Sequence, residues 1–420
     1  MKFAILGVLF FVFSTSLFGG LKVDLGCTSA VLINSKTGKV LFQKNASQEM
    51  YPASCTKIAF ALYAIKFHEA LFTRRIAASK NCLKSLPEAQ KSKKNFSLHP
   101  SYILETDSSH MGLKVGEELS FYELLEATIV VSADDASNVI AEVMGNGSID
   151  KCVDDVNRYI KSLGIQSTRF MNPHGLHHPE HVSTALDLAR LSQEAMKDPL
   201  FRKIAKMPRF LRPKTNKQLA VHLQTTNRLL VKGSSAYYPP AVGIKTGYHR
   251  RAGHCLVSEA EKDGRSLIAV VLQAKTRDDR FRDTVKLFQA AFDETKTTKT
   301  YLPSGSQEFS RVVVGGRDPL RTYTDEPICH TFYPSENPET RCQLVWHEVV
   351  LPVKKGTPVG QLLFHADGKV VQKTTLYAAN GVDETFTHTL KKRLPRPWIL
   401  FGLIGFIGIG LGLFAVSKSK

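Results

Sequence analysis

The stretch PASCTK at residues 52–57 decides how the rest of the chain is interpreted. Its Ser54 and Lys57 are three residues apart, and residues at that spacing share one face of a helix. The residues that follow, Ile58–Ile65, are apolar on every side, which is typical of a helix in the core of a large domain. Pro52 favours a helix N-terminus at this point. The pattern predicts a serine at the start of a buried helix, with its lysine one turn deeper.

This pair of side chains meets the requirements of nucleophilic catalysis. A serine hydroxyl attacks poorly until a neighbouring base takes its proton. A lysine amine can act as that base when burial or a second cation lowers its pKa. The S-x-x-K pattern also occurs at Ser148–Lys151 and Ser417–Lys420, but neither copy precedes an apolar helix. A helix-capping serine beside a surface lysine is the alternative interpretation of Ser54 and Lys57.

Bulk composition limits the class of protein and its partners. The chain has 420 residues, 43% hydrophobic and 22% charged, so it can form two or three globular domains. Its formal net charge is +18, but the basic residues are scattered and no zinc-finger or RNA-binding pattern occurs, which argues against nucleic acid. An anionic membrane or cell-wall polymer is the favoured partner, and a solvated basic surface is the alternative. Seven scattered cysteines predict neither a disulfide scaffold nor a metal site.

Both ends of the chain are apolar. A charged start and the run Phe3–Phe13, followed by small residues, predict an export signal over residues 1–20, with a retained N-terminal anchor as the alternative. Residues 398–416 are uncharged over 19 positions, enough to cross a hydrocarbon core of about 30 Å. Residues 389–397 are basic and predict a linker to this C-terminal transmembrane anchor.

Two domains are predicted between these ends. In residues 24–300, strands such as Ala30–Ile33 and Ser266–Gln273 enclose amphipathic helices, which predicts an α/β domain with an antiparallel sheet flanked by helices. Short apolar runs separated by Gly, Pro and Asp turns predict a small all-β domain over residues 305–388. Its expected strands are Arg311–Val314, Val345–Val353, Val359–Phe364 and Val370–Tyr377.

Three short motifs stand in order along the first domain. They are Ser54-x-x-Lys57, Ser132-Ala133-Asp134 at a polar break in the helix expected over 121–142, and Lys245-Thr246-Gly247 after a strand. A second Lys-Thr-Gly, at residues 36–38, lies at the tip of an expected hairpin and is discounted. Together with Pro173–Leu176, the motifs closely resemble the penicillin-binding, active-site-serine D,D-peptidases, specifically the low-molecular-weight D-alanyl-D-alanine carboxypeptidases. The resemblance extends over nearly the whole chain, including the β-rich domain and the C-terminal segment.

The resemblance implies a penicillin-binding, transpeptidase-like fold and a role for each motif residue. Ser54 would attack the carbonyl of the penultimate D-alanine, Lys57 would take the serine proton, and Ser132 would relay a proton to the leaving D-alanine. Lys245 would keep Lys57 partly neutral and attract the substrate carboxylate. The remaining substrate-binding residues would be Thr246, Gly247 and Tyr248, with the backbone N–H groups of Ser54 and Tyr248 holding the oxyanion. The resemblance implies no metal and no cofactor.

Two departures from the family pattern are expected to affect the site. Where the middle motif usually ends in Asn, this chain has Asp134, and an ionised carboxylate cannot donate a hydrogen bond. We expect Asp134 to orient Lys57 as an ion pair, to raise the pKa of Lys57 and so to weaken it as a base. Where the family often has an arginine for the substrate carboxylate, this chain has Lys275, with Arg277 and Arg280 nearby. Specificity for a free C-terminus is expected to be looser.

The hypothesis that follows is a bacterial cell-envelope enzyme. It would remove the terminal D-alanine from peptidoglycan stem pentapeptides and would be acylated by penicillins and other β-lactams. It would be exported and anchored to the cytoplasmic membrane by the C-terminal helix, with its catalytic domain on the periplasmic side. A D,D-endopeptidase, a β-lactamase and a non-catalytic wall-binding protein are the alternatives. His174, in a turn, is assigned a structural role.

Overall fold

The computed structural model describes residues 8–12 and 20–393, which divide into two compact units. Residues 20–295 form an α/β unit, and residues 296–393 together with 8–12 form a β unit. The separate α/β and all-β folds predicted from the sequence are confirmed. Contacts within the chain divide it between Thr295 and Lys296. The exact domain limits expected from the sequence, 24–300 and 305–388, remain predictions.

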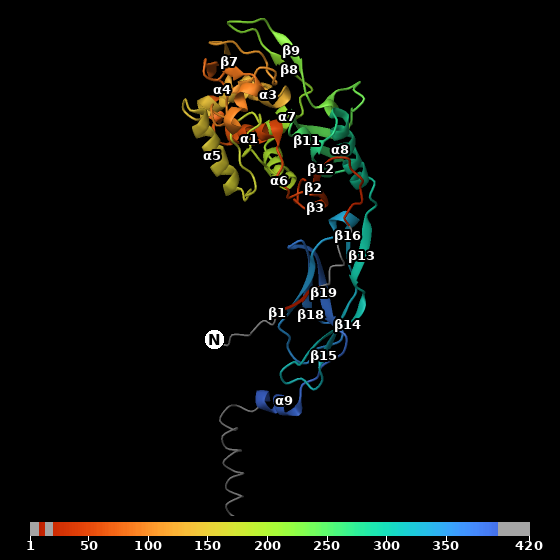
Figure 1. The fold of residues 1–420 in the computed structure, drawn as a ribbon. Helices are drawn as coiled ribbons and strands as arrows, with labels where there is room; N and C mark the ends of the chain where they lie inside the picture. The colour runs from red at the N-terminus through yellow and green to blue at the C-terminus, as the bar shows by residue number, and fades with distance from the viewer. Residues whose placement is uncertain (1–7, 13–19, 394–420) are drawn as a thin grey trace, which may run out of the picture. The chain divides into compact units, whose positions relative to one another are not determined.

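An antiparallel sheet of five strands, in the order β10-β11-β12-β2-β3, is the centre of the α/β unit (Figure 1). Its strands are β2 (Ser29–Asn34), β3 (Val40–Lys44), β10 (Ala241–His249), β11 (Gly253–Lys262) and β12 (Arg265–Ala274). Successive side chains of β12 point to opposite faces. Ile268 and Val270 pack in the larger helical core, and Ala269 and Val271 pack in a second core with α8. Both faces of the sheet are therefore buried.

Six helices contribute to the larger core, and a seventh covers the other face of the sheet. The first group is α1 (Lys57–Phe67), α3 (Phe121–Val130), α4 (Asp134–Met144), α5 (Ile149–Ser162), α6 (Ala185–Met196) and α7 (Pro199–Ala205). Helix α8 (Arg277–Phe292) packs against β11 and β12 (Figure 1). Eight of the eleven residues of α1 are buried, which confirms the central helix predicted from its apolar sequence. The polar break expected at Ser132 is also confirmed, since α3 ends at Val130 and α4 begins at Asp134, although Asp134 itself belongs to the second helix.

Short elements complete the α/β unit. Three two-stranded pairs are β4 (Arg75–Ala77) with β7 (Glu118–Ser120), β5 (Ser85–Leu86) with β6 (Leu104–Glu105), and β8 (Arg209–Arg212) with β9 (Val221–Gln224). The short helices are α2 (Glu88–Lys91), η1 (Ala53–Thr56), η2 (Glu69–Leu71), η3 (Lys93–Phe96) and η4 (Arg228–Leu230). Of these, η1 positions the candidate nucleophile.

The β unit is a six-stranded sheet in the order β1-β17-β18-β19-β15-β14, with a separate pair β13-β16 (Figure 1). Its elements are β1 (Val8–Val12), β13 (Thr297–Leu302), β14 (Gly305–Arg311), β15 (Leu320–Thr324), β16 (Ile328–Phe332), η5 (Pro334–Glu336), β17 (Thr340–Trp346), β18 (Pro358–Ala366), β19 (Lys369–Ala378) and α9 (Phe386–Arg393). The strands expected over 311–314 and 345–353 were placed too far along the chain. The valines favour strand locally, but β14 ends at Arg311 and β17 at Trp346, where their ladders stop.

The apolar ends of the chain are described only in part. Val8–Val12, inside the predicted export signal, forms β1 next to β17, and the rest of residues 1–19 lies outside the described part. Residues 389–393 of the predicted linker belong to α9, and the predicted anchor at 398–416 lies outside the described residues. No helix within the described residues has the length and apolarity needed to cross a bilayer.

Candidate active site

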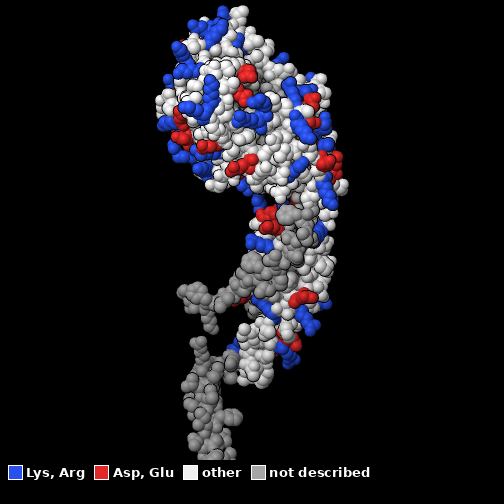
Figure 2. Space-filling view, viewed as in Figure 1, with Lys and Arg blue, Asp and Glu red and all other residues white. Residues whose placement is uncertain are grey.

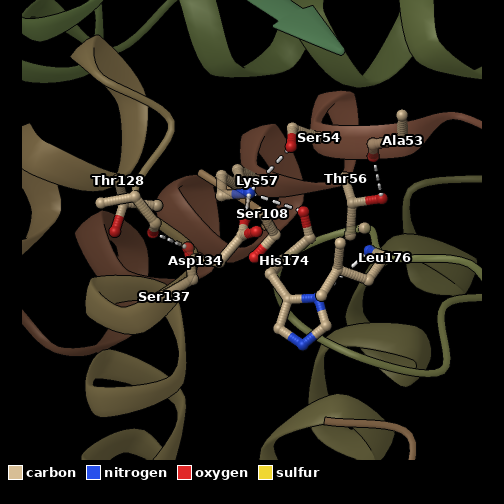
Figure 3. Close-up of polar contacts among 12 residues, drawn as sticks. Ala53, Ser54, Thr56, Lys57, Ser108, Thr128, Asp134, Ser137, His174 and Leu176 are labelled. Atoms are coloured by element: carbon tan, nitrogen blue, oxygen red, sulfur yellow. Dashed lines mark hydrogen bonds and ion pairs between the residues drawn. The ribbon is translucent and has the colours of Figure 1, made fainter. Parts of the chain in front are cut away.

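Ser54 and Lys57 meet where η1 passes into the central helix. Ser54 lies in η1, and Lys57 is the first residue of α1. The Lys57 Nζ lies 3.0 Å from the Ser54 Oγ, so the spacing in the sequence does bring the two groups together (Figure 3). Ser54 is half-buried and lines a pocket, whereas Lys57 is fully buried. The alternative of a capping serine beside a surface lysine is wrong, because this lysine has no exposed surface.

Three acceptors surround the Lys57 Nζ and match the three N–H groups of an ammonium. Besides the Ser54 Oγ, they are the Asp134 Oδ1 and the backbone oxygen of His174, both at 2.6 Å (Figure 3). Asp134 is also buried, so the expected ion pair is present and lies in the interior. In this arrangement Lys57 donates to Ser54. It can accept the serine proton only after it has lost one of its own.

Opposing effects set the pKa of Lys57. Burial lowers this pKa because the charged ammonium loses its hydration, and the Asp134 carboxylate raises it again. The net result is a pKa below the usual lysine value. The sequence predicted a buried helix at Lys57 and the raising effect of Asp134, but it did not predict that burial would outweigh the carboxylate. The pKa of Lys245 falls well below its usual value, mainly through burial and next through the positive charge of Lys57.

Ser132 occupies the turn between α3 and α4. Its φ of 65° lies in the left-handed region, which a residue with a side chain adopts only when its surroundings enforce it. The turn is held by hydrogen bonds on both sides, since the Ala133 N–H donates to the Ala127 oxygen and the Asp134 N–H to the Ser109 oxygen. The Ser132 side chain lines the same pocket as Ser54. Backbone strain at this point fits a residue placed for function.

Asp135 fixes the loop that forms the adjoining wall of the pocket. Its carboxylate accepts hydrogen bonds from the backbone N–H groups of Met111, Gly112 and Leu113, at 3.0 to 3.1 Å. Its side chain is buried, so these bonds replace the water that a carboxylate needs. The loop just before Met111 contains Ser109, which lines the pocket. No sequence pattern indicates this role, because the partners are backbone groups.

Strand β10 brings the third motif beside η1. Thr246, Gly247 and Tyr248 line the pocket, and the Thr246 Oγ1 lies 2.6 Å from the Thr226 Oγ1. A side chain at Gly247 would come 3.1 Å from the backbone nitrogen of Ser54, so this close approach of strand to nucleophile requires glycine. Lys245 is buried, and its Nζ donates to the Thr246 oxygen at 3.0 Å.

The pocket has a volume of about 260 Å³ and gathers all three motifs. Its lining residues are Ser54, Ser109, Ser132, Thr226, Thr246, Gly247, Tyr248, His254, Arg277 and Arg280. Tyr248 is exposed, and its ring stacks on that of His254 with the centroids 4.3 Å apart. Lys275 is exposed and does not line the pocket, contrary to the expectation from the sequence. The turn after β12 directs the two arginines, and not the lysine, to the site.

Arg280 is a buried cation at this pocket. Its Nη1 donates to the backbone oxygens of Gly247 and Cys255, at 3.0 and 3.4 Å, and its Nε has no hydrogen-bond partner in the described part of the chain. Burial lowers the pKa of Arg280 to about 10, so it remains charged at neutral pH. Within the described residues no carboxylate forms an ion pair with it. A buried cation without a counter-ion favours binding of an anion from solution.

The buried His181 stabilises the backbone next to Ser54 through Thr56. The Met171 N–H donates to the His181 Nδ1, so the proton of this imidazole is on Nε2, which donates to the Thr56 Oγ1 at 2.7 Å. The Thr56 hydroxyl in turn donates to the oxygen of Ala53, whose φ of 47° is again left-handed. Burial lowers the pKa of His181 well below its usual value, so it stays neutral. This chain of bonds fixes the residue next to Ser54, and its contacts are too distant in sequence to be predicted.

His174 contributes through its backbone. The side chain is buried, with its Nε2 3.1 Å from the Tyr102 oxygen and its Nδ1 accepting from the Leu176 N–H. The ring therefore has structural partners, in line with the role assigned from the sequence. Its backbone oxygen, one of the Lys57 acceptors, is the contribution that the sequence did not predict.

Comparison with known families identifies the chain. The model of the D-alanyl-D-alanine carboxypeptidase family, peptidase S11, matches residues 20–276. The chain belongs to this family. A second model, the C-terminal domain of penicillin-binding protein 5, matches residues 305–384. The enzyme is therefore a hydrolase of the serine D,D-peptidase type, and the resemblance drawn from its motifs is confirmed.

Relatives and solved structures cover most of the enzyme. It is 30% identical to the D-alanyl-D-alanine carboxypeptidase DacF of Bacillus subtilis over 376 residues, 89% of this chain and 90% of the relative. It is 29% identical to DacC of Escherichia coli over 84% of each chain. The structure of penicillin-binding protein 5 from Haemophilus influenzae covers 87% of this chain and 100% of its own, with a TM-score of 0.58 and 24% identity. This last likeness shows the shared fold.

Proposed function

We propose that the enzyme removes the terminal D-alanine from peptidoglycan stem pentapeptides through an acyl-enzyme on Ser54. The 3.0 Å contact between the Ser54 Oγ and the amine of a fully buried lysine, beside a pocket, carries this proposal. The family gives the type of reaction. The pocket offers a nucleophile, a base and cationic groups for a carboxylate.

Acylation begins when neutral Lys57 takes the hydroxyl proton as the Ser54 oxygen attacks the carbonyl carbon of the penultimate D-alanine. The backbone N–H groups of Ser54 and Tyr248 hold the oxyanion that forms. The close packing of Gly247 against the Ser54 backbone supports this assignment, because it brings the strand that carries Tyr248 next to Ser54, and both residues line the pocket. The C–N bond then breaks, and Ser132 passes the proton from Lys57 to the leaving amine. Lys57 is neutral again at the end of the step.

Deacylation uses water. Water attacks the ester carbonyl, its proton returns to the Ser54 oxygen through Lys57, and the shortened peptide leaves with a new carboxylate. No acidic side chain is among the pocket-lining residues of the described structure. A β-lactamase needs fast deacylation of a penicilloyl ester, so this lining favours a penicillin-inhibited peptidase over a β-lactamase.

Recognition of a free C-terminus is assigned to the arginine side of the pocket. Arg280 is buried there without a carboxylate partner, and Arg277 lies at the surface beside it. Thr246 adds a hydroxyl donor, and Lys245 adds positive potential from behind the strand. These groups take the role that was expected of Lys275. They favour carboxypeptidase activity over endopeptidase activity, because an internal peptide bond presents no terminal carboxylate.

The same proposal covers the place of the enzyme in the cell. Residues 1–20 act as an export signal, 389–397 as a basic linker and 398–416 as an anchor in the cytoplasmic membrane. Residues 24–300 then form the catalytic domain on the periplasmic side of a bacterial envelope, and residues 305–388 form the β domain that precedes the anchor in the sequence. The uncharged 19-residue segment and the small residues after the first apolar run support this arrangement.

Labelling with a fluorescent penicillin tests the nucleophile. We expect covalent labelling of the native enzyme and none of the Ser54→Ala variant. Ser148→Ala is the matched control, because Ser148 belongs to another S-x-x-K sequence and only caps α5 through the Lys151 N–H. A labelled Ser54→Ala enzyme would show that another residue is acylated.

A second assay identifies the substrate. Release of D-alanine from a stem pentapeptide is compared with cleavage of a cross-linked peptide dimer, and we expect the first to be faster. Faster cleavage of the dimer would instead identify a D,D-endopeptidase. Rapid loss of the penicillin label together with penicillin hydrolysis would identify a β-lactamase.

A further inference from the structure

One end of the β unit exposes large apolar side chains. Val312, Val314, Val350 and Phe386 are between 77% and 87% exposed, which is unusual for side chains of this size in a soluble domain. We call these four residues the apolar tip. Elsewhere in the β unit the exposed valines, Val370 and Val371, are about half as exposed.

Contacts between the loops bring the members of the apolar tip together. The Thr385 N–H and hydroxyl both donate to the Gly315 oxygen, so the residues on either side, Phe386 and Val314, come from neighbouring segments. The Arg311 Nη2 donates to the His347 oxygen at 2.7 Å, which ties the loop of Val312 to that of Val350. Figure 1 shows α9 at the end of this unit, next to the connection between β14 and β15.

The valines of the apolar tip lie outside the strands of the sheet. Their sequences favour strands, yet the ladders of β14 and β17 stop at Arg311 and Trp346, and the valines stand beyond them. The core of the unit is complete without them, because Val313 and Leu351, their neighbours in sequence, already point into it. Their exposure therefore favours a partner outside the described chain.

The following sequence points to lipid as that partner. Helix α9 ends at Arg393, and the uncharged segment begins at Trp398, five residues later. Five residues span at most about 18 Å. If residues 398–416 cross the bilayer as proposed above, the C-terminal end of α9 lies within that distance of the bilayer core, and Phe386 of the apolar tip begins the same helix. Three basic residues, Lys391–Arg393, end the helix, and Lys354–Lys355 follow Val353, which pairs with Val382 close to α9. Cations at this place are attracted to anionic headgroups.

We propose that the apolar tip of the β unit docks into the headgroup region of an anionic bilayer. The inference rests on the membrane anchoring in the proposed function and adds a second contact to it. A single flexible anchor leaves the domain free to tilt, whereas an anchor together with a docked tip holds the β unit in one orientation on the membrane.

The test uses the full chain in vesicles of phosphatidylethanolamine and phosphatidylglycerol. A polarity-sensitive fluorophore is attached at Val314→Cys or Phe386→Cys, in a Cys329→Ser background, because Cys329 is the one cysteine in the described chain that is not buried. Lipids with a doxyl group near the headgroup then quench a fluorophore that touches the bilayer. Val371→Cys is the matched control, since it lies at the opposite end of β19 and is also exposed.

We expect at least twofold stronger quenching at Val314 and Phe386 than at Val371, and a weaker effect in vesicles of phosphatidylcholine alone. Equal quenching at the three sites, in enzyme that floats with the vesicles, overturns the docking of the tip and leaves the anchor intact. A chain that does not float with the vesicles overturns both the anchor and the docked tip. A blue shift that grows with protein concentration and is insensitive to doxyl lipid identifies a second copy of the chain as the partner, and also overturns the proposal.

Discussion

The α/β unit and the β unit differ in what they bury. Every Lys, Arg, Asp and Glu that is buried in the described structure lies in the α/β unit. Among the polar side chains described in the β unit, those that are buried are hydroxyls and one histidine, and several valines are exposed. Most buried charges of the α/β unit have structural partners, such as the backbone donors around Asp135. Arg280 lines the pocket beside Ser54, and the buried Lys57 and Lys245 each donate a hydrogen bond to a pocket-lining residue. Figure 2 shows that the Lys and Arg side chains of the visible face are spread over it.

From this difference we infer that the positions of buried charged side chains locate the reactive site better than the net charge of the chain does. The excess of +18 belongs mostly to a solvated surface and does not identify a ligand. A buried charge is costly unless it is paired, so it persists where pairing or function maintains it. Substitutions of buried charges test that contrast, and the largest effect is expected at Lys57.

Replacing Lys57 removes both a base and one half of a buried ion pair. For Lys57→Met we expect penicillin acylation to slow by about 10²- to 10⁴-fold, the usual contribution of a general base. The unfolding free energy of the α/β unit should fall by about 3–5 kcal/mol, because Asp134 is left buried without its cation. Stopped-flow labelling and urea unfolding measure the two effects. The double variant Lys57→Met/Asp134→Leu should recover stability without activity, and equal losses of stability in both would contradict the role of the ion pair.

Replacing Asp134 shifts the pH dependence. Lys57 must be neutral to accept the serine proton, so acylation rises as pH rises through the pKa of Lys57. Asp134 raises that pKa, and Asp134→Asn removes the raising charge. We therefore expect the acid limb of the pH–rate profile to move down by about one pH unit or more, which gives faster acylation on that limb. An unmoved limb would mean that another group controls the rate.

Arg277 and Lys275 lie close together after β12, so replacing each in turn distinguishes direct contact with the substrate from a general effect of positive charge. Arg277→Gln should lower kcat/KM for a peptide with a free C-terminus by about tenfold, the value of one hydrogen bond to a charged group. Lys275→Gln removes the same charge two residues away, outside the pocket, and should change kcat/KM little. The difference between the variants should disappear with a peptide whose C-terminus is amidated. Equal losses in both variants would indicate a field effect of the whole surface.

The sequence predicted the site where local pattern determines structure. The apolar run after Lys57 could only be a buried helix, and Ser132 stood at a polar break between helices. It failed where tertiary packing decides. Whether burial or Asp134 dominates the pKa of Lys57 depends on packing by distant segments. The choice of Arg277 over Lys275 depends on how the chain turns into α8. Likewise, valine propensity predicted strands at 311–314, but no ladder partner is available there.

The smallest effect is expected in the β unit, at its one buried histidine. His365 lies in β18, and neither ring nitrogen has a hydrogen-bond partner in the described structure. Replacing an unsatisfied polar group by an apolar one of similar volume is neutral or stabilising. For His365→Leu we expect an unfolding free energy of the β unit that is unchanged or about 1 kcal/mol higher, with unaltered penicillin labelling.

Thr322→Val is the matched comparison within the same unit, because the Thr322 hydroxyl is buried and donates to the Phe309 oxygen at 2.8 Å. Its removal takes away this hydrogen bond and should lower the unfolding free energy by about 1 kcal/mol. Opposite signs for the two variants would show that the β unit is sensitive to pairing and not to polarity as such. A large loss in His365→Leu would instead show that the imidazole has a partner, such as bound water, and that the two units differ less than their buried charges indicate.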